Sequence, residues 1–189
     1  TQRGYVRFIV EMCEIFGDYL KSRRLKHFSD RQTLWTQLEK FIDSVHRSLD
    51  SRETAYTMAN EGRRLIQCDR VSVALRKGGR FRIEAVSGMD MIDRRAATVK
   101  DLGQLSSAVA ASREPVWYMG SSEDLPPQIE ESLQSYVDQS HSKMIAVIPL
   151  SRTVEEPASQ EQESRDEPPV EVVGALIVEN IDDNRVDNA

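Results

Sequence analysis

Apolar residues in the first third of the chain recur at steps of three and four, which is the period of an α-helix. One stripe runs over residues 5–20 and is rich in aromatic side chains, and a second runs over residues 34–49. Because residues three and four apart lie on one face of a helix, both stripes predict amphipathic helices. We expect these helices to form a small bundle or a dimer interface, with an apolar seam that contains Phe8, Met12, Ile15, Leu38, Phe41 and Val45.

A third helix is predicted to begin at residues 50–53, where the sequence DSRE has the spacing of a capping box. After Cys68 the period changes from helical to alternating, and the paired glycines Gly78 and Gly79 supply the positive φ angles of a tight hairpin turn. The first strand of this hairpin is expected to carry Val71, Val73 and Leu75 on one face, and the second to carry Phe81, Ile83 and Ala85 on one face.

The rest of the chain mixes helical and strand patterns. In chain order we expect an irregular stretch at residues 89–101, a helix from about Leu105, a strand at 116–119, a helix that begins at Pro126 and Pro127, and strands at 143–150 and 171–180. This order predicts an α+β sandwich with a mostly antiparallel sheet of five or six strands, flanked by helices and preceded by a helical extension.

The two last strands are joined by a tract that no core would accept. Residues 152–169 are rich in Glu, Ser, Gln and Pro and hold almost no large apolar side chain. Such a tract cannot offset its ordering entropy by burial, so a disordered acidic loop is expected. We assign residues 1–50 to a two-helix extension, residues 51–183 to the sandwich domain and residues 184–189 to a tail.

The amino-acid composition limits the kinds of partner and the compartment that we expect for this chain. The net charge is −6, and residues 155–189 hold eleven acidic residues against two arginines. An acidic chain whose basic residues form no stripe is not expected to bind nucleic acid. No apolar run approaches the roughly 20 residues of a membrane span, so no direct membrane insertion of this segment is expected. Cys13 and Cys68 are isolated thiols, which indicates a reducing compartment, and we expect the cytoplasm.

Four stretches together resemble a GAF domain, the small-molecule-sensing and dimerising module of signalling proteins. They are EGRRLIQCDRVSVALRKGGRF, GQLSSAVAASREPVWY, KMIAVIPL and VVGALIVEN, and their order and spacing match the family over roughly residues 51–183. The resemblance implies a pocket between the sheet and the helices and loops on one face. It also implies a place in a longer signalling protein, with flanking helices that pack into a homodimer.

The chain departs from the ligand-binding patterns of that family. Asn184 and Arg185 lie at the chain end, with nothing after them to complete a cyclic-nucleotide constellation. The helix ESLQSYVDQSHS offers His141 but no thiol for a bilin, and Cys13 and Cys68 do not lie in pocket loops as the sulfoxide-reductase members require. The cofactor, if there is one, therefore stays unknown.

Five residues are candidates for a ligand site. Trp117 could form a wall for a planar ligand, Tyr136 and His141 could donate hydrogen bonds, and Arg94 and Arg95 could hold an anion bidentately. Each also has a structural interpretation, as a core aromatic residue, a partly exposed polar pair or solvated loop charges. No triad, paired-carboxylate pattern or metal-ligand spacing stands out, so neither an enzyme nor a metal site is expected.

Two functions remain open. The chain is either a non-catalytic regulatory domain that binds a small molecule or relays a signal through its flanking helices, or a dimerisation scaffold that has the same fold and no ligand. An open pocket would favour the regulatory domain, and a pocket filled by the protein's own side chains would favour the scaffold.

The predicted seam can be tested by introducing a charge. Phe8→Glu or Phe41→Glu should weaken oligomerisation, because either change places a carboxylate in an apolar contact. Size-exclusion chromatography with light scattering measures the mass in solution, and an unchanged mass would count against the seam.

Overall fold

The computed structural model describes residues 31–122, 125–153 and 170–181. The chain divides into two compact units, Thr1–Asp43 and Ser44–Ala189. Residues 31–45 are helical, so the helix predicted for the second apolar stripe is confirmed, although it ends before Leu49. The predicted seam residues Phe8, Met12 and Ile15 lie outside the described residues.

The sheet has five strands in the order β2-β1-β5-β4-β3, and every neighbouring pair is antiparallel. The strands are β1 (Arg70–Lys77), β2 (Arg80–Val86), β3 (Val116–Tyr118), β4 (Met144–Thr153) and β5 (Val170–Asn180). The predicted hairpin is β1–β2, with Gly78 and Gly79 at positive φ in its turn. The predicted α+β sandwich with an antiparallel sheet is therefore confirmed.

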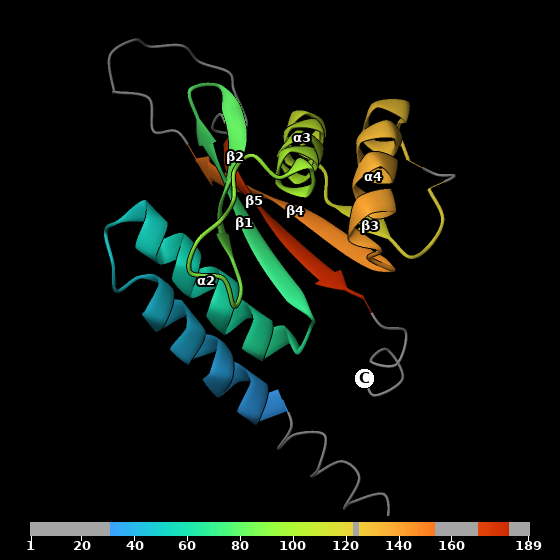
Figure 1. Cartoon of the computed structure of the whole chain (residues 1–189). Helices are drawn as coiled ribbons and strands as arrows, with labels where there is room; N and C mark the ends of the chain where they lie inside the picture. The colour runs from blue at the N-terminus through green and yellow to red at the C-terminus, as the bar shows by residue number, and fades with distance from the viewer. Residues whose placement is uncertain (1–30, 123–124, 154–169, 182–189) are drawn as a thin grey trace, which may run out of the picture. The chain divides into compact units, whose positions relative to one another are not determined.

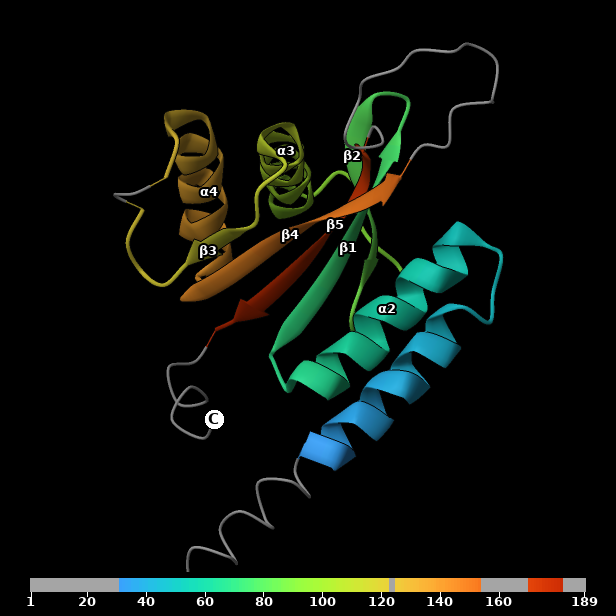
Figure 2. The same ribbon diagram turned by 180° about the vertical axis from the view of Figure 1, so that it is seen from behind.

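Helices cover both faces of this sheet (Figures 1 and 2). Helix α2 (Ser51–Ile66) packs on one face over β1 and β2, while α3 (Ala97–Ser112) and α4 (Pro127–Ser140) lie side by side on the other. Small side chains line the buried face of α2 and let it lie close to the strands: they are Ala55, Ala59 and Gly62.

The predicted start of α2 is confirmed. The carboxylate of Asp50 accepts hydrogen bonds from the backbone N–H groups of Arg52 (2.7 Å) and Glu53 (3.4 Å), which satisfies two donors that the first helical turn leaves free. The return bond of a capping box is replaced, because Glu53 accepts from the Ser48 hydroxyl at 2.6 Å instead.

The main core lies between the sheet and helices α3 and α4. Its buried side chains come from all five strands and both helices, and each large apolar one contributes roughly 1.5–3 kcal/mol by leaving water. The largest of them are Ile83, Leu105, Leu133, Ile145, Ile177, Val109 and Val147. A smaller cluster lies beneath α2, formed by Ala55, Ala59, Val73 and Ala85.

The prediction that Phe81, Ile83 and Ala85 share one face of β2 is wrong. Ile83 and Phe81 belong to the core under α3, whereas Ala85 belongs to the cluster under α2. The register explains the change: Ala74 lies opposite Ile83 and Val73 opposite Ala85, so Glu84 has no partner on β1. One inserted residue is a β-bulge, and it moves every later side chain to the other face.

Helix α3 begins eight residues earlier than predicted, at Ala97 instead of about Leu105. Its first turn carries no acidic residue and its N-cap, Ala96, makes no side-chain hydrogen bond, so the sequence gives no start signal. Strand β4 also continues past the expected end at residue 150, to Thr153. The remainder of the acidic tract lies outside the described residues.

One glycine is required by a close approach between strands. A Cβ built on Gly174 in β5 would lie 2.7 Å from the carbonyl oxygen of Ala74 in β1, a distance that real Cβ atoms do not adopt. We therefore expect Gly174→Ala to lower the free energy of unfolding by about 1–3 kcal/mol, through overpacking. Urea denaturation measures this loss.

Ser151→Ala is the matched control, because Ser151 lies one strand away on β4 and is exposed. It should change the free energy of unfolding by less than about 0.5 kcal/mol. If the two variants were equally stable, Gly174 would not be required by the contact with Ala74.

Candidate functional site

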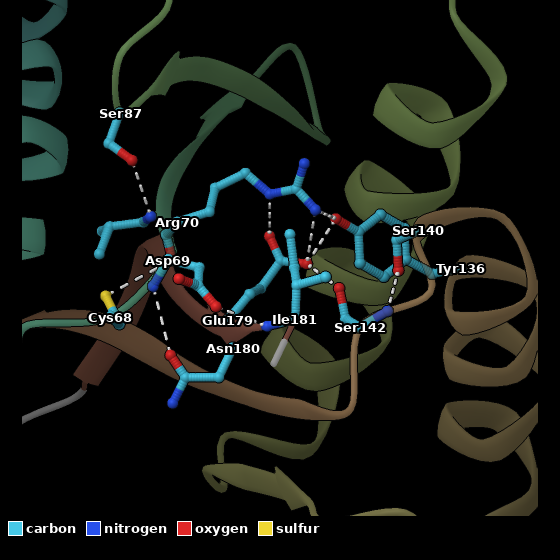
Figure 3. A network of polar contacts seen from close by, with 11 residues as sticks. Cys68, Asp69, Arg70, Ser87, Tyr136, Ser140, Ser142, Glu179, Asn180 and Ile181 are labelled. Carbon is cyan, nitrogen blue, oxygen red and sulfur yellow. Dashed lines mark hydrogen bonds and ion pairs between the residues drawn. The ribbon is translucent and has the colours of Figure 1, made fainter. Parts of the chain in front are cut away.

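A buried carboxylate joins three elements of the domain (Figure 3). Glu179, near the end of β5, is 0% exposed and accepts hydrogen bonds from several donors. Arg70 at the start of β1 donates from Nε to Oε2 at 2.9 Å and from Nη2 to Oε1 at 3.3 Å. The Tyr136 hydroxyl on α4 donates to Oε1 at 2.7 Å, and the Ser142 hydroxyl donates to the same oxygen at 2.9 Å.

This network is fully paired, and it is structural. Burial of the Tyr136 ring and the negative charge of Glu179 both raise the pKa of the Tyr136 hydroxyl above its usual range. The hydroxyl therefore remains a donor at neutral pH and holds α4 to the end of β5. Neither Tyr136 nor Glu179 lines any of the pockets described below, so the pair is not open to a ligand there.

Hydrogen bonds between backbone N–H groups and side-chain oxygens join the ends of β1 and β5 beside this network (Figure 3). The backbone N–H of Asp69 donates to the side-chain oxygen of Asn180 at 3.2 Å, and the N–H of Ile181 donates to the Asp69 carboxylate at 2.8 Å. These contacts fix the point at which the last strand leaves the sheet.

A pocket of about 830 Å³ lies between the edge strand β2 and one face of α3. Its volume is in the range of small-molecule sites. Its walls combine cationic, polar and apolar side chains from β2, the segment that follows it and the first turns of α3. The lining residues are Arg80, Phe81, Arg82, Ile83, Arg94, Val99, Lys100, Gly103, Gln104 and Ser107.

Arg94 connects this β2–α3 pocket to the bulge residue Glu84. The Glu84 side chain is only 1% exposed, and Arg94 Nη2 lies 3.5 Å from its Oε1. Lys77 Nζ lies 3.0 Å from Oε2 as an ion pair, although this oxygen accepts no hydrogen bond. The contact with Arg94 is long for a charge-assisted hydrogen bond, so the Arg94 side chain is weakly held.

Two of the domain's other hollows are lined in part by candidate residues. One, of about 390 Å³, lies at the start of α2 and is lined by Asp50, Tyr56, Glu84 and Arg94 among others. The other, of about 840 Å³, lies between β3 and α4 and is lined by residues that include His141. The first of these shares Arg94 with the β2–α3 pocket.

The structure separates the five residues proposed as ligand contacts. Arg94 lines the β2–α3 pocket and His141 lines the hollow between β3 and α4, so these two do not belong to one site. Tyr136 lies in the buried network, Trp117 is 58% exposed, and Arg95 is exposed; none of these three lines either pocket.

Sequence reasoning missed most of the cationic lining. Arg80 and Arg82 were not among the candidate residues, and Lys100 fell in the stretch expected to be irregular. The sequence did contain a signal for a cationic site, because the basic residues Arg80 and Arg82 recur at alternate positions directly after the Gly78–Gly79 turn. The buried Glu179 was also missed, although it continues the alternation of Ala175 and Ile177.

The described residues contain neither a metal-ligand cluster nor a membrane-spanning helix. No group of three His, Cys, Asp or Glu side chains there could hold a metal ion. In the same part of the chain, no helix combines the length and the apolar character needed to cross a membrane.

Comparison with known proteins gives likenesses of structure only. No family model matches the sequence. No curated protein matches it either.

Solved structures with a similar fold include several GAF domains. The GAF domain of an Acinetobacter phosphoenolpyruvate-protein phosphotransferase is 15% identical, with a TM-score of 0.48, and the match covers 78% of this chain and 77% of that chain. A methyl-accepting chemotaxis protein is 13% identical (TM-score 0.49; 80% and 86% covered). The chromophore-binding domain of a bacteriophytochrome from R. palustris is 14% identical (TM-score 0.49; 79% and 53% covered).

These similar structures include GAF domains, the family that the sequence was predicted to resemble, at identities of 8–15% and TM-scores of 0.46–0.48. At these identities the likeness does not extend to a ligand or an activity.

The buried network predicts a pH-dependent contribution of Tyr136. Tyr136→Phe removes one donor from buried Glu179 and should lower the free energy of unfolding by about 1–3 kcal/mol at neutral pH. Because the folded-state pKa of Tyr136 is raised, its stabilisation is fully present below the ordinary tyrosine value of about 10 and is lost as the pH rises above it.

Urea denaturation of the wild type and the variant at pH 7 and pH 11 measures this difference. The stability gap between the two proteins should narrow at the higher pH, because only the wild type carries the buried phenol. Tyr118→Phe on β3 is the control and should show no such gap. A gap that stayed constant with pH would contradict the assignment.

Proposed function

We propose that this chain is a non-catalytic regulatory domain that binds a small molecule in the β2–α3 pocket. The observation that carries the proposal is the pocket itself, which has the volume of a ligand site and is lined by both apolar and polar side chains. The resemblance to GAF domains implies the same role. The cytoplasmic location and the homodimer expected from the sequence belong to this proposal.

The position of Arg94 provides a route from the pocket to α2. Arg94 and Glu84 both line the hollow at the start of α2, and Arg94 also lines the β2–α3 pocket. A ligand that engages the Arg94 guanidinium competes with Glu84 for it. Glu84 lies in the bulge of β2, and α2 packs on β1 and β2, so a change at this ion pair acts on the strands that support α2.

A regulatory signal needs a ligand that binds two arrangements with different affinity. In this domain the two arrangements are Arg94 paired with Glu84 and Arg94 turned to the ligand. The output leaves through α2 and the helix at residues 31–45 that precedes it in the chain. On that helix Leu38, Phe41 and Val45 are half-buried, and Trp35 is 64% exposed.

The second candidate function, a dimerisation scaffold, is favoured by a different observation. The space between the sheet and helices α3 and α4 is filled by the protein's own side chains, including Leu105, Leu133 and Ile177. Most of the space in which the family resemblance implies a pocket is therefore occupied, and the open part lies at the sheet edge, between β2 and α3. The two functions differ in whether the open pocket at the sheet edge is ever occupied.

Native mass spectrometry of freshly purified protein, compared with its denatured mass, tests the proposal. A regulatory domain should carry extra mass that dissociates on denaturation or on collisional activation. Gln104→Trp should abolish this extra mass, because Gln104 is an exposed residue that lines the pocket and the indole fills it.

Gln134→Trp is the matched control, since Gln134 is exposed on α4 and does not line this pocket. It should retain the extra mass. A protein that carries no extra mass, and for which no compound in a metabolite library raises the melting temperature, would favour the scaffold.

A further inference from the structure

The charge of the β2–α3 pocket identifies the class of ligand. Resting on the proposed function, we infer that the pocket takes an organic anion, a phosphate- or carboxylate-bearing small molecule with an apolar part. The anionic group is bound by Arg80, Arg82, Arg94 and Lys100, and the apolar part lies on Phe81, Ile83 and Val99.

The lining contains four cationic residues and no acidic one. The acidic residues nearest in sequence are engaged elsewhere. Asp93 accepts a hydrogen bond from the backbone N–H of Arg95 at 2.9 Å, and Asp101 accepts from Ser135 and Gln139 on α4 at 3.3 and 2.6 Å. The pocket therefore presents a concentrated positive potential in a protein whose net charge is −6.

The cationic side chains of the pocket are available to a ligand. Within the described residues, the side chains of Arg80, Arg82 and Lys100 form no ion pair and no hydrogen bond. Arg94 reaches only the Glu84 carboxylate, at 3.5 Å, and Glu84 also has Lys77 as a partner. Guanidinium groups bind phosphate and carboxylate with paired donors, so two or more of these side chains can hold one anionic group.

The first turn of α3 adds to this charge. Most helices favour acidic residues there, because the free N–H groups give the N-terminus a partial positive charge. Here the first turn contains no acidic residue, and Lys100 follows at its end. A bound anion would offset the repulsion between Lys100 and the helix dipole.

The apolar wall argues against a simple inorganic ion as the natural ligand. Phe81 and Val99 are half-buried at the pocket and Ile83 is buried, so they form an apolar surface beside the cations. A pocket of about 830 Å³ is also much larger than one phosphate. A ligand with an anionic group and an apolar part can contact both the cationic residues and the apolar surface.

Phenyl phosphate is a suitable probe, because it joins a dianion to a flat apolar ring. Titration into ¹⁵N-labelled protein should give saturable amide shifts in β2 and in residues 94–107, with a Kd below about 5 mM. Inorganic phosphate lacks the ring and phenol lacks the charge, so each should bind at least about tenfold more weakly.

The double variant Arg80→Gln/Arg82→Gln should weaken phenyl phosphate about tenfold or more, through loss of charge-assisted hydrogen bonds. Arg113→Gln is the matched control, because Arg113 is an exposed arginine at the end of α3 that does not line the pocket. It should leave the affinity unchanged. Lys100→Gln provides a second, single-site test if the double variant does not fold.

The outcomes separate this inference from the proposed function. Phenol that binds at the same amides as tightly as phenyl phosphate would overturn the anion class and leave the small-molecule pocket in place. Phenyl phosphate that causes no shift at these amides, or that binds the double variant as tightly as the wild type, would also overturn the anion class. The proposed function itself is overturned only if the protein carries no extra mass in native mass spectrometry and no compound raises its melting temperature.

Discussion

The burial of the Glu179 carboxylate is the constraint on which the arrangement of the domain depends. A fully buried charge costs several kcal/mol unless donors replace its water, and a single missing partner would leave it uncompensated. Arg70, Tyr136 and Ser142 supply those donors from β1, from α4 and from the residues before β4. The carboxylate can be satisfied only when these elements lie together, so it specifies both the β1–β5 pairing and the docking of α4.

This constraint also decides where a ligand can bind. With Tyr136 held at 2.7 Å from Glu179, α4 lies against the sheet, and Leu133 and Ile129 from the same helix fill the space beneath it. The interior is therefore used for stability. Space remains at the sheet edge, where α3 passes beside β2. Within the described residues, Arg80, Arg82 and Lys100 have no acidic partner there, and Arg94 has only Glu84. The Glu179 network joins β1 and β5, whereas the pocket lies against β2. A ligand at β2 therefore does not have to disturb the Glu179 network.

Local signals predicted the elements well, and pairings between distant residues were not predictable. The Gly78–Gly79 turn and the Asp50 cap were correct, because each acts over a few residues. The bulge at Glu84 could not be found, since alternation in one strand contains no information about a partner that skips a residue. The N-cap of helix α3, Ala96, has no side chain that can accept a hydrogen bond, so the sequence did not indicate that the helix begins at Ala97. The cationic pocket draws on β2, the following segment and α3, and only the fold brings these together.

The bulge gives the edge pocket a route to the opposite face of the sheet. Without an inserted residue, Ala85 would follow Ile83 into the core under α3, and the strand would present one uniform surface to each layer. The bulge instead leaves Glu84 unpaired in the ladder, with its carboxylate between Lys77 and Arg94. Arg94 then borders both the β2–α3 pocket and the hollow at the start of α2. A ligand that bound at the edge, as proposed, would reach α2 through one ion pair, whereas a ligand beneath α4 would first have to open a close-packed core. The filled interior, which alone would favour a scaffold, is compatible with sensing when the sensor lies at the edge.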